Sequence, residues 1–196
     1  YYFSLNVKFL HSYNAYFGSG RPINWPNQLL WVFDKDGVIL AGWPKEINYD
    51  FEREFLIVDL NNDGFREIIF ENSIFMDYGN SIANINVLNY KGENIANWPV
   101  NINTLIDSSY KYITIDSLSV GDINNDGDLE ILLSVSAEVE LGYWDAPVFC
   151  LIAITNKGDL VPGFPLCPGY GFSDNNLPNP EMVFYGVPTL ANIDED

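Results

Sequence analysis

Two short segments of this 196-residue chain place carboxylate and amide side chains at alternate positions around a glycine. Calcium is held by about six to eight oxygen atoms, and a tight loop can supply them from alternate residues. Both segments offer such oxygens, so we predict one calcium ion in each. The predicted ligands are Asp59, Asn61, Asp63, the main-chain carbonyl of Phe65 and Glu67 in the first segment, and Asp122, Asn124, Asp126, the carbonyl of Asp128 and Glu130 in the second.

Two other structures use the same residue types. The first is an Asx turn in a hairpin, which needs no metal; such a turn does not require the ninth-position carboxylate, Glu67 or Glu130, that both segments contain. The second is an EF-hand, which needs flanking helices and a glutamate at its twelfth position. That position holds Phe70 or Leu133, each within an apolar, strand-like run. The pattern therefore favours a calcium loop between two strands.

A hairpin pattern recurs three times along the chain. A strand-like run ends in a turn glycine, and six residues later an aromatic residue precedes a proline. The glycine and aromatic pairs are Gly37 and Trp43, Gly92 and Trp98, and Gly158 and Phe164. Because β-branched and aromatic residues flank short Asp/Asn/Gly turns, these runs are expected to be strands. We expect the three aromatic side chains to pack between neighbouring units.

Alternation of acidic loops and hairpins predicts an all-β fold with four short antiparallel strands per unit. For the middle unit the predicted strands are 54–60, 65–71, 83–89 and 93–99, with the proline ending an outer edge strand. Units of this kind are typical of β-propeller blades. The predicted division of the single partial propeller domain 1–196 is the end of one blade at 1–50, blades at 51–110 and 111–180, and the start of another at 181–196. About three blades are represented, which predicts a fragment of a larger propeller.

The paired Asp-x-Asn-x-Asp-Gly-x-x-Glu loops at 59–67 and 122–130, with the later Gly-to-Trp-Pro hairpins, resemble FG-GAP/VCBS repeats. Integrin α-subunit propellers and many secreted microbial proteins contain such repeats. The resemblance covers roughly residues 28–196, and a third loop begins at 192–196. It implies an extracellular calcium-binding propeller used for adhesion, ligand binding or scaffolding. Implied partners are a protein or glycan ligand at the cell surface. An alternative is the accessory propeller of a secreted hydrolase or polysaccharide lyase.

The charge balance excludes some other functions. Nine basic residues against 27 acidic ones give a formal net charge of −18, so nucleic acid and anionic lipid would be repelled. No apolar run is long enough to insert into a membrane, and the first ten residues lack the pattern of a signal peptide. His11, the single histidine, has no catalytic partner that sequence can identify, and we predict no catalytic residue.

Three further expectations concern single residues and edges. Trp25, Tyr143 and Trp144 interrupt the repeat, which favours contact with a ligand. The sequence does not decide whether Cys150 and Cys167 form a disulfide, because a regular hairpin would leave Cys167 on the order of 13 Å from its partner along the strand. Unpaired blade edges would also allow neighbouring copies to associate, which leaves a structural subunit as a third possible role.

Overall fold

The computed structural model describes residues 6–10, 28–34, 36–47, 55–75, 81–140, 145–167 and 188. These residues form an all-β structure, which confirms the predicted fold class at that level. In this part of the chain the one helical element is a single 3-10 turn, η2 (Ile102–Thr104), and no helix could cross a membrane.

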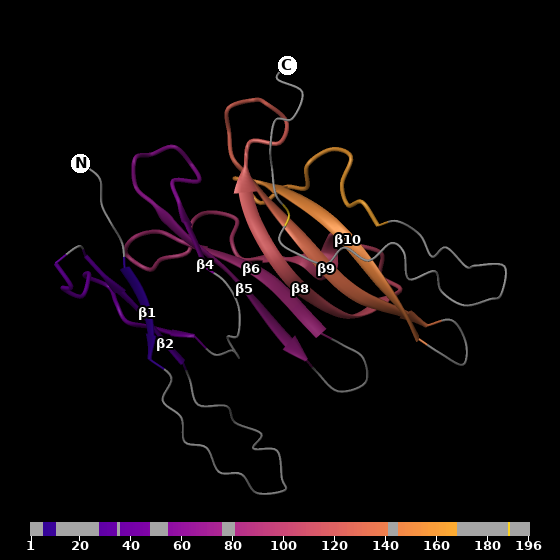
Figure 1. The fold of residues 1–196 in the computed structure, drawn as a ribbon, viewed down its shortest axis with the longest axis horizontal. Helices are drawn as coiled ribbons and strands as arrows, with labels where there is room; N and C mark the ends of the chain where they lie inside the picture. The colour runs from indigo at the N-terminus through magenta and orange to yellow at the C-terminus, as the bar shows by residue number, and fades with distance from the viewer. Residues whose placement is uncertain are drawn as a thin grey trace, which may run out of the picture.

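The strands pair antiparallel into three separate sheets (Figure 1). The first sheet has the order β1-β2-β3, the second β4-β5-β6-β7 and the third β10-β9-β8. Their bounds are β1 (Asn6–Leu10), β2 (Gln28–Phe33), β3 (Lys45–Ile47), β4 (Phe55–Val58), β5 (Glu67–Phe75), β6 (Ser81–Leu88), β7 (Val100–Asn101), β8 (Tyr110–Gly121), β9 (Glu130–Glu140) and β10 (Asp145–Thr155). The predicted blade start at 181–196 lies outside the described residues, apart from residue 188.

The second sheet is covered on both faces. β6 alternates buried and half-buried residues, as expected of a strand with one face in a core. On β5, by contrast, Ile68, Ile69 and Phe70 are all buried, although neighbouring side chains point to opposite faces. Ile68 and Phe70 pack with the first sheet, whereas Ile69 packs with the third. The sheets therefore stack in chain order, with the second in the middle.

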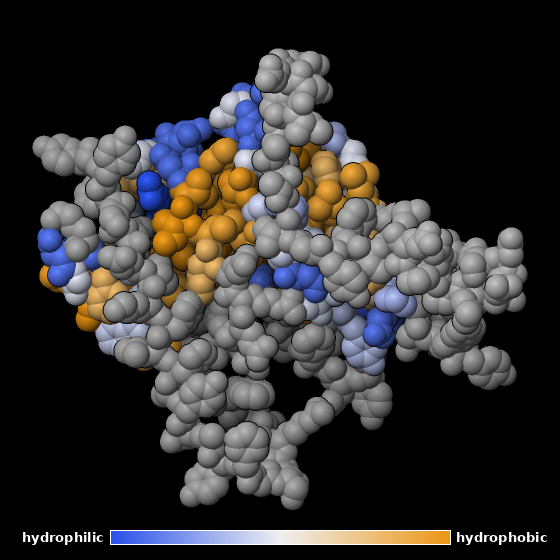
Figure 2. Space-filling model, viewed as in Figure 1, coloured by the Kyte–Doolittle hydropathy of each residue, from blue (hydrophilic) through white to orange (hydrophobic). Residues whose placement is uncertain are grey.

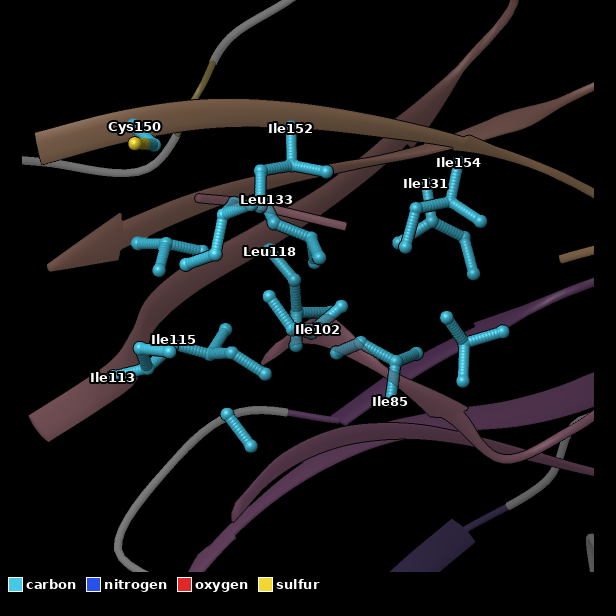
Figure 3. Packing of buried hydrophobic residues seen from close by; sticks show 14 of the residues in the cluster. Ile85, Ile102, Ile113, Ile115, Leu118, Ile131, Leu133, Cys150, Ile152 and Ile154 are labelled. Carbon is cyan, nitrogen blue, oxygen red and sulfur yellow. The ribbon is translucent and has the colours of Figure 1, made fainter. Parts of the chain in front are cut away.

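The larger core lies between the second and third sheets. Figure 3 shows its isoleucine and leucine side chains meeting between the strands, among them Ile85 of β6, Ile115 of β8 and Ile152 of β10. All three are fully buried. Branched aliphatic side chains fill such a space well, since each buried one contributes about 1.5–3 kcal/mol. This core holds the strands that carry both acidic loops.

The three hairpins share one set of backbone hydrogen bonds. In the second hairpin the N–H of Gly92 donates to the carbonyl of Asn89 at 2.8 Å, and the N–H of Trp98 donates to that of Ile95 at 3.2 Å. The corresponding pairs in the other hairpins are Gly37 to Asp34, Trp43 to Leu40, Gly158 to Thr155 and Phe164 to Val161. The recurring sequence pattern therefore has one recurring structure.

Each hairpin contains an insertion that corrects the predicted fourth strand. Leu88 pairs with Asn94 and Ile85 with Val100, so one side advances three residues while the other advances six. The second tight turn, closed by Trp98, takes up the extra three residues together with Pro99. The predicted strand at 93–99 is therefore wrong, because β7 begins after the proline, which precedes the outer strand instead of ending it.

The same insertion decides the cysteine pairing. In the third hairpin it places Leu166 opposite Leu151, and their N–H groups donate to each other's carbonyls at 2.8 Å in both directions. Cys167 then lies beside Cys150 with a Cα–Cα distance of 4.2 Å, and the two form a disulfide. A regular hairpin would have kept the two cysteines apart, which is why the sequence alone did not decide whether they are bonded.

Candidate metal centre

The two acidic loops occupy the same place in their sheets. The first connects β4 to β5, with Glu67 as the first residue of β5. The second connects β8 to β9, with Glu130 as the first residue of β9. Both loops lie at the upper edge of the molecule in Figure 1, where hydrophilic residues gather above a hydrophobic band in Figure 2. Stacking of the sheets thus brings both predicted sites to one edge.

The first loop is folded around its own side-chain oxygens. The two carboxylate oxygens of Asp59 accept the N–H groups of Asp63 at 3.0 Å and Gly64 at 2.9 Å. The amide oxygen of Asn61 also accepts the Asp63 N–H at 3.0 Å, and Asp63 accepts that of Phe65 at 2.8 Å. These bonds hold the predicted ligands in one tight bend, which Gly64 permits with a φ of 87°.

The second loop repeats this network with the same atoms. Asp122 accepts the N–H groups of Asp126 at 3.2 Å and Gly127 at 2.9 Å. Asn124 accepts the Asp126 N–H at 2.9 Å, and Asp126 accepts that of Asp128 at 2.8 Å. Asn62 and Asn125, which follow the third position of each loop, have φ values of 57° and 63°. Asparagine tolerates this left-handed region better than most residues, so the sequence suits the bend.

The ninth-position glutamates close the loops from inside. Glu67 accepts the N–H of Leu60 at 2.9 Å, and Glu130 accepts that of Ile123 at 3.0 Å. Both glutamates are 1% exposed. Burial therefore raises the pKa of each carboxyl above its ordinary value of 4.5, and these backbone N–H bonds oppose that rise.

Negative neighbours act in the same direction as burial. The carboxylates of Asp63 and Asp59 raise the pKa of Glu67 further. Those of Asp126, Asp122 and Asp128 do so for Glu130. None of the groups that shift these two glutamates is a basic side chain. Each loop therefore gathers negative charge around a buried carboxyl, a setting that a divalent cation would stabilise.

The oxygen atoms of these loops suit calcium chemically. Carboxylate, amide and main-chain carbonyl oxygens are the ligands that this ion prefers, and each oxygen has two lone pairs. Within the described residues, no three His, Cys, Asp or Glu side chains converge closely enough to hold a metal by themselves. A calcium site here would therefore depend on Asn61 or Asn124 and on main-chain carbonyls, with carboxylates that now accept N–H groups turned toward the ion.

An aromatic contact beside the first loop was missed by the sequence reasoning. The ring of Phe65, 44% exposed, stacks on Tyr90 with 4.8 Å between ring centroids. The Lys91 ammonium lies 5.5 Å from the centre of the Tyr90 ring. Asp128 replaces Phe65 in the second loop, so the contact does not recur. No spacing rule connects Phe65 to Tyr90, because the contact arises between a loop and a separate hairpin.

The other predicted functional residues divide into two groups. Trp43 and Trp98 are buried in the cores between sheets, as expected of packing residues, whereas Phe164 is half-buried against residues of the third sheet alone. His11, Trp25, Tyr143, Trp144 and the third loop at 192–196 lie outside the described residues. No protein-family model matches this chain, and neither the curated proteins nor the solved structures contain a match.

Proposed function

We propose that this chain is part of an extracellular β-propeller of FG-GAP/VCBS type that binds calcium in the loops at 59–67 and 122–130. It serves as a binding or scaffold module and not as an enzyme. Three stacked antiparallel sheets, each with the same hairpin, support the propeller. In this proposal the sheets are successive blades of a larger ring.

One observation carries the calcium proposal. Two loops of matching sequence fold into the same hydrogen-bond network, and each is closed by a buried glutamate surrounded by negative charge. In a turn without metal that glutamate accepts a loop N–H group, but its burial beside the aspartates disfavours its charge. Bound calcium would neutralise the carboxylates and hold β4 to β5 and β8 to β9, so its role is structural.

The disulfide and the charge support an extracellular location and a surface partner. Disulfides persist in oxidising compartments, and Cys150 and Cys167 form one here. A net charge of −18 opposes binding to nucleic acid. We therefore propose a protein or glycan at the cell surface as ligand, met by variable loops at one face of the sheets.

Calorimetric titration and thermal unfolding test the calcium sites. Two calcium ions should bind with dissociation constants near 10⁻⁴–10⁻³ M, each contributing about 0.5–1.5 kcal/mol at millimolar calcium. The melting temperature should rise by roughly 2–4 °C for each kcal/mol relative to protein in excess EGTA.

Asp126→Asn is the sharpest variant, because an amide oxygen can still accept the Asp128 N–H but carries no charge. We expect it to keep its calcium-free stability and lose one of the two binding events. Magnesium at the same concentration is the control, since that ion tolerates such flexible oxygen sites poorly. An unchanged melting temperature together with no heat of calcium binding would refute the calcium sites.

A further inference from the structure

The aromatic contact beside the first acidic loop continues into the neighbouring sheet. The ring of Phe65 stacks on that of Tyr90, with 4.8 Å between the ring centroids. Tyr90 lies in the turn of the second hairpin, and its main-chain carbonyl accepts the indole N–H of Trp43 at 2.8 Å. Trp43 is 7% exposed and belongs to the core between the first and second sheets. Tyr90 therefore contacts both an acidic loop and a residue of the first hairpin.

The rest of this turn also fits closely against the first hairpin. A Cβ on Gly42 would overlap the main-chain carbonyl of Lys91, and a Cβ on Gly92 would overlap the side chain of Lys45. Closely packed atoms transmit a displacement to their neighbours instead of absorbing it. A shift of the turn at 90–92 would therefore disturb the packing of the first sheet on the second.

The main chain of Phe65 is held by the acidic loop itself. Its N–H donates to the carboxylate of Asp63 at 2.8 Å, and its carbonyl is one of the predicted calcium ligands. An ion held by Asp63 and by that carbonyl would restrain the main chain on both sides of the Phe65 ring, which is 44% exposed. Ordering the loop would thus favour the position in which this ring meets Tyr90.

The third sheet carries a matching acidic loop and hairpin without this aromatic contact. Asp128 replaces Phe65, and Asn156 replaces Tyr90. Because neither replacement has a ring, the stack cannot form there. Trp98 is the corresponding tryptophan, and among the described residues its buried indole N–H has no hydrogen-bond partner. The two acidic loops are therefore alike in their oxygen atoms and different in what lies beside them.

We propose that the first acidic loop is coupled to the packing of the first sheet on the second through Phe65, Tyr90 and Trp43. The second loop has no such coupling. This inference rests on the proposed function for its ligand, calcium, although the contacts themselves need no ion. Calcium at the first loop then favours the packed arrangement of the first sheet, and by reciprocity that packing favours binding of calcium. The first ion would hold two successive sheets together, whereas the second would hold two strands of one sheet.

A double-mutant cycle in excess EGTA tests the coupling without calcium. Phe65→Leu keeps an apolar side chain and removes the stacked ring, and Trp43→Phe keeps a ring and removes the indole donor. The folding equilibrium constant of the double variant should exceed by about fivefold or more the value expected from two independent losses. Phe65→Leu with Trp98→Phe is the matched control, and its two losses should be additive within about twofold.

Calorimetric titration with calcium then measures the effect on binding. Asp126→Asn leaves the first loop as the intact site, and Asp63→Asn leaves the second. In the Asp126→Asn background, Trp43→Phe should raise the dissociation constant for calcium about fivefold. In the Asp63→Asn background, Trp98→Phe should change it by less than about twofold.

The two measurements separate failure of this inference from failure of the proposed calcium sites. Additive losses from Phe65→Leu and Trp43→Phe would overturn the coupling, whether or not calcium binds. A coupled cycle without any heat of calcium binding would support the coupling and refute the calcium sites. Equal weakening of binding in both backgrounds would overturn the assignment to the first loop, since a general loss of packing affects both sites.

Discussion

The carboxyl groups of Glu67 and Glu130 differ from the other acidic residues of the two loops. Both are almost fully buried, whereas most acidic side chains of the two loops reach solvent. Burial costs the charged form more than the neutral form, and the surrounding aspartates add to that cost. If calcium binds as proposed, these two residues would make the loops respond to both protons and cations.

The stability of calcium-free protein should consequently depend on pH. The folded state raises both pKa values above 4.5, so it binds protons that the unfolded state releases. The resulting stabilisation is complete below pH 4.5 and is lost as pH rises through the folded-state pKa values. Urea unfolding in EGTA, measured from below pH 4.5 upward, should show that the contribution of these two glutamates to the free energy of unfolding falls as the pH rises.

Variants can separate the pH dependence that Glu67 and Glu130 cause from the pH dependence that comes from the net charge of the chain. Glu67→Gln with Glu130→Gln should remove part of the pH dependence, whereas Glu46→Gln on the exposed part of β3 should retain it. The stabilisation by calcium should show the opposite trend and vanish on acidification, because protonated carboxyls do not bind the ion. An equal pH dependence in all variants would contradict the assignment to these glutamates.

At the scale of elements, the hairpins show what sequence could and could not predict. The turn glycines and asparagines placed both acidic loops and all three hairpins correctly, because positive φ angles restrict residue choice. The outer strand was misplaced, since an aromatic residue before a proline does not reveal a second tight turn. Contacts between hairpins, such as Asn97 with Lys157, lie 60 residues apart and leave no local pattern.

Substitutions at two glycines measure how much the contact between the first and second hairpins contributes to the free energy of unfolding. Gly42 and Gly163 hold corresponding positions, and both have a φ of 94°. Alanine at either position carries the backbone strain of about 1–2 kcal/mol. At Gly42 it would also displace the Lys91 carbonyl, whereas at Gly163 it meets nothing in the described chain.

Gly42→Ala should therefore be more destabilising than Gly163→Ala by about 1–3 kcal/mol. Chemical denaturation of the two variants measures both free energies of unfolding. An equal loss of unfolding free energy in both variants would show that the contact between Gly42 and Lys91 contributes little to the stability of the fold.

For the whole molecule, the disulfide is the one covalent link between distant residues. It ties the outer edge of the third sheet to β10 across 17 residues of sequence. Closing such a loop in the unfolded chain stabilises the folded state by about 3 kcal/mol. Cys167 directly follows Leu166 in the sequence, so the bond also helps to hold Leu166 in its pairing with Leu151.

Removing the disulfide should loosen that edge without unfolding the second sheet. Cys150→Ala with Cys167→Ala should destabilise the chain by about 2–4 kcal/mol, as measured by thermal unfolding. A reducing agent should lower the melting temperature of the unaltered chain by a similar amount and leave the double variant unaffected. A reductant effect on the variant would point to a cause other than this bond.

Both stacking interfaces depend on β5. Ile68 and Ile69 are neighbours on this strand, both are fully buried, and they belong to different cores. Damage to either interface uncovers one side of a strand that the opposite interface also needs. The three sheets are therefore expected to lose structure together in a single cooperative transition, although each of them is a separate sheet.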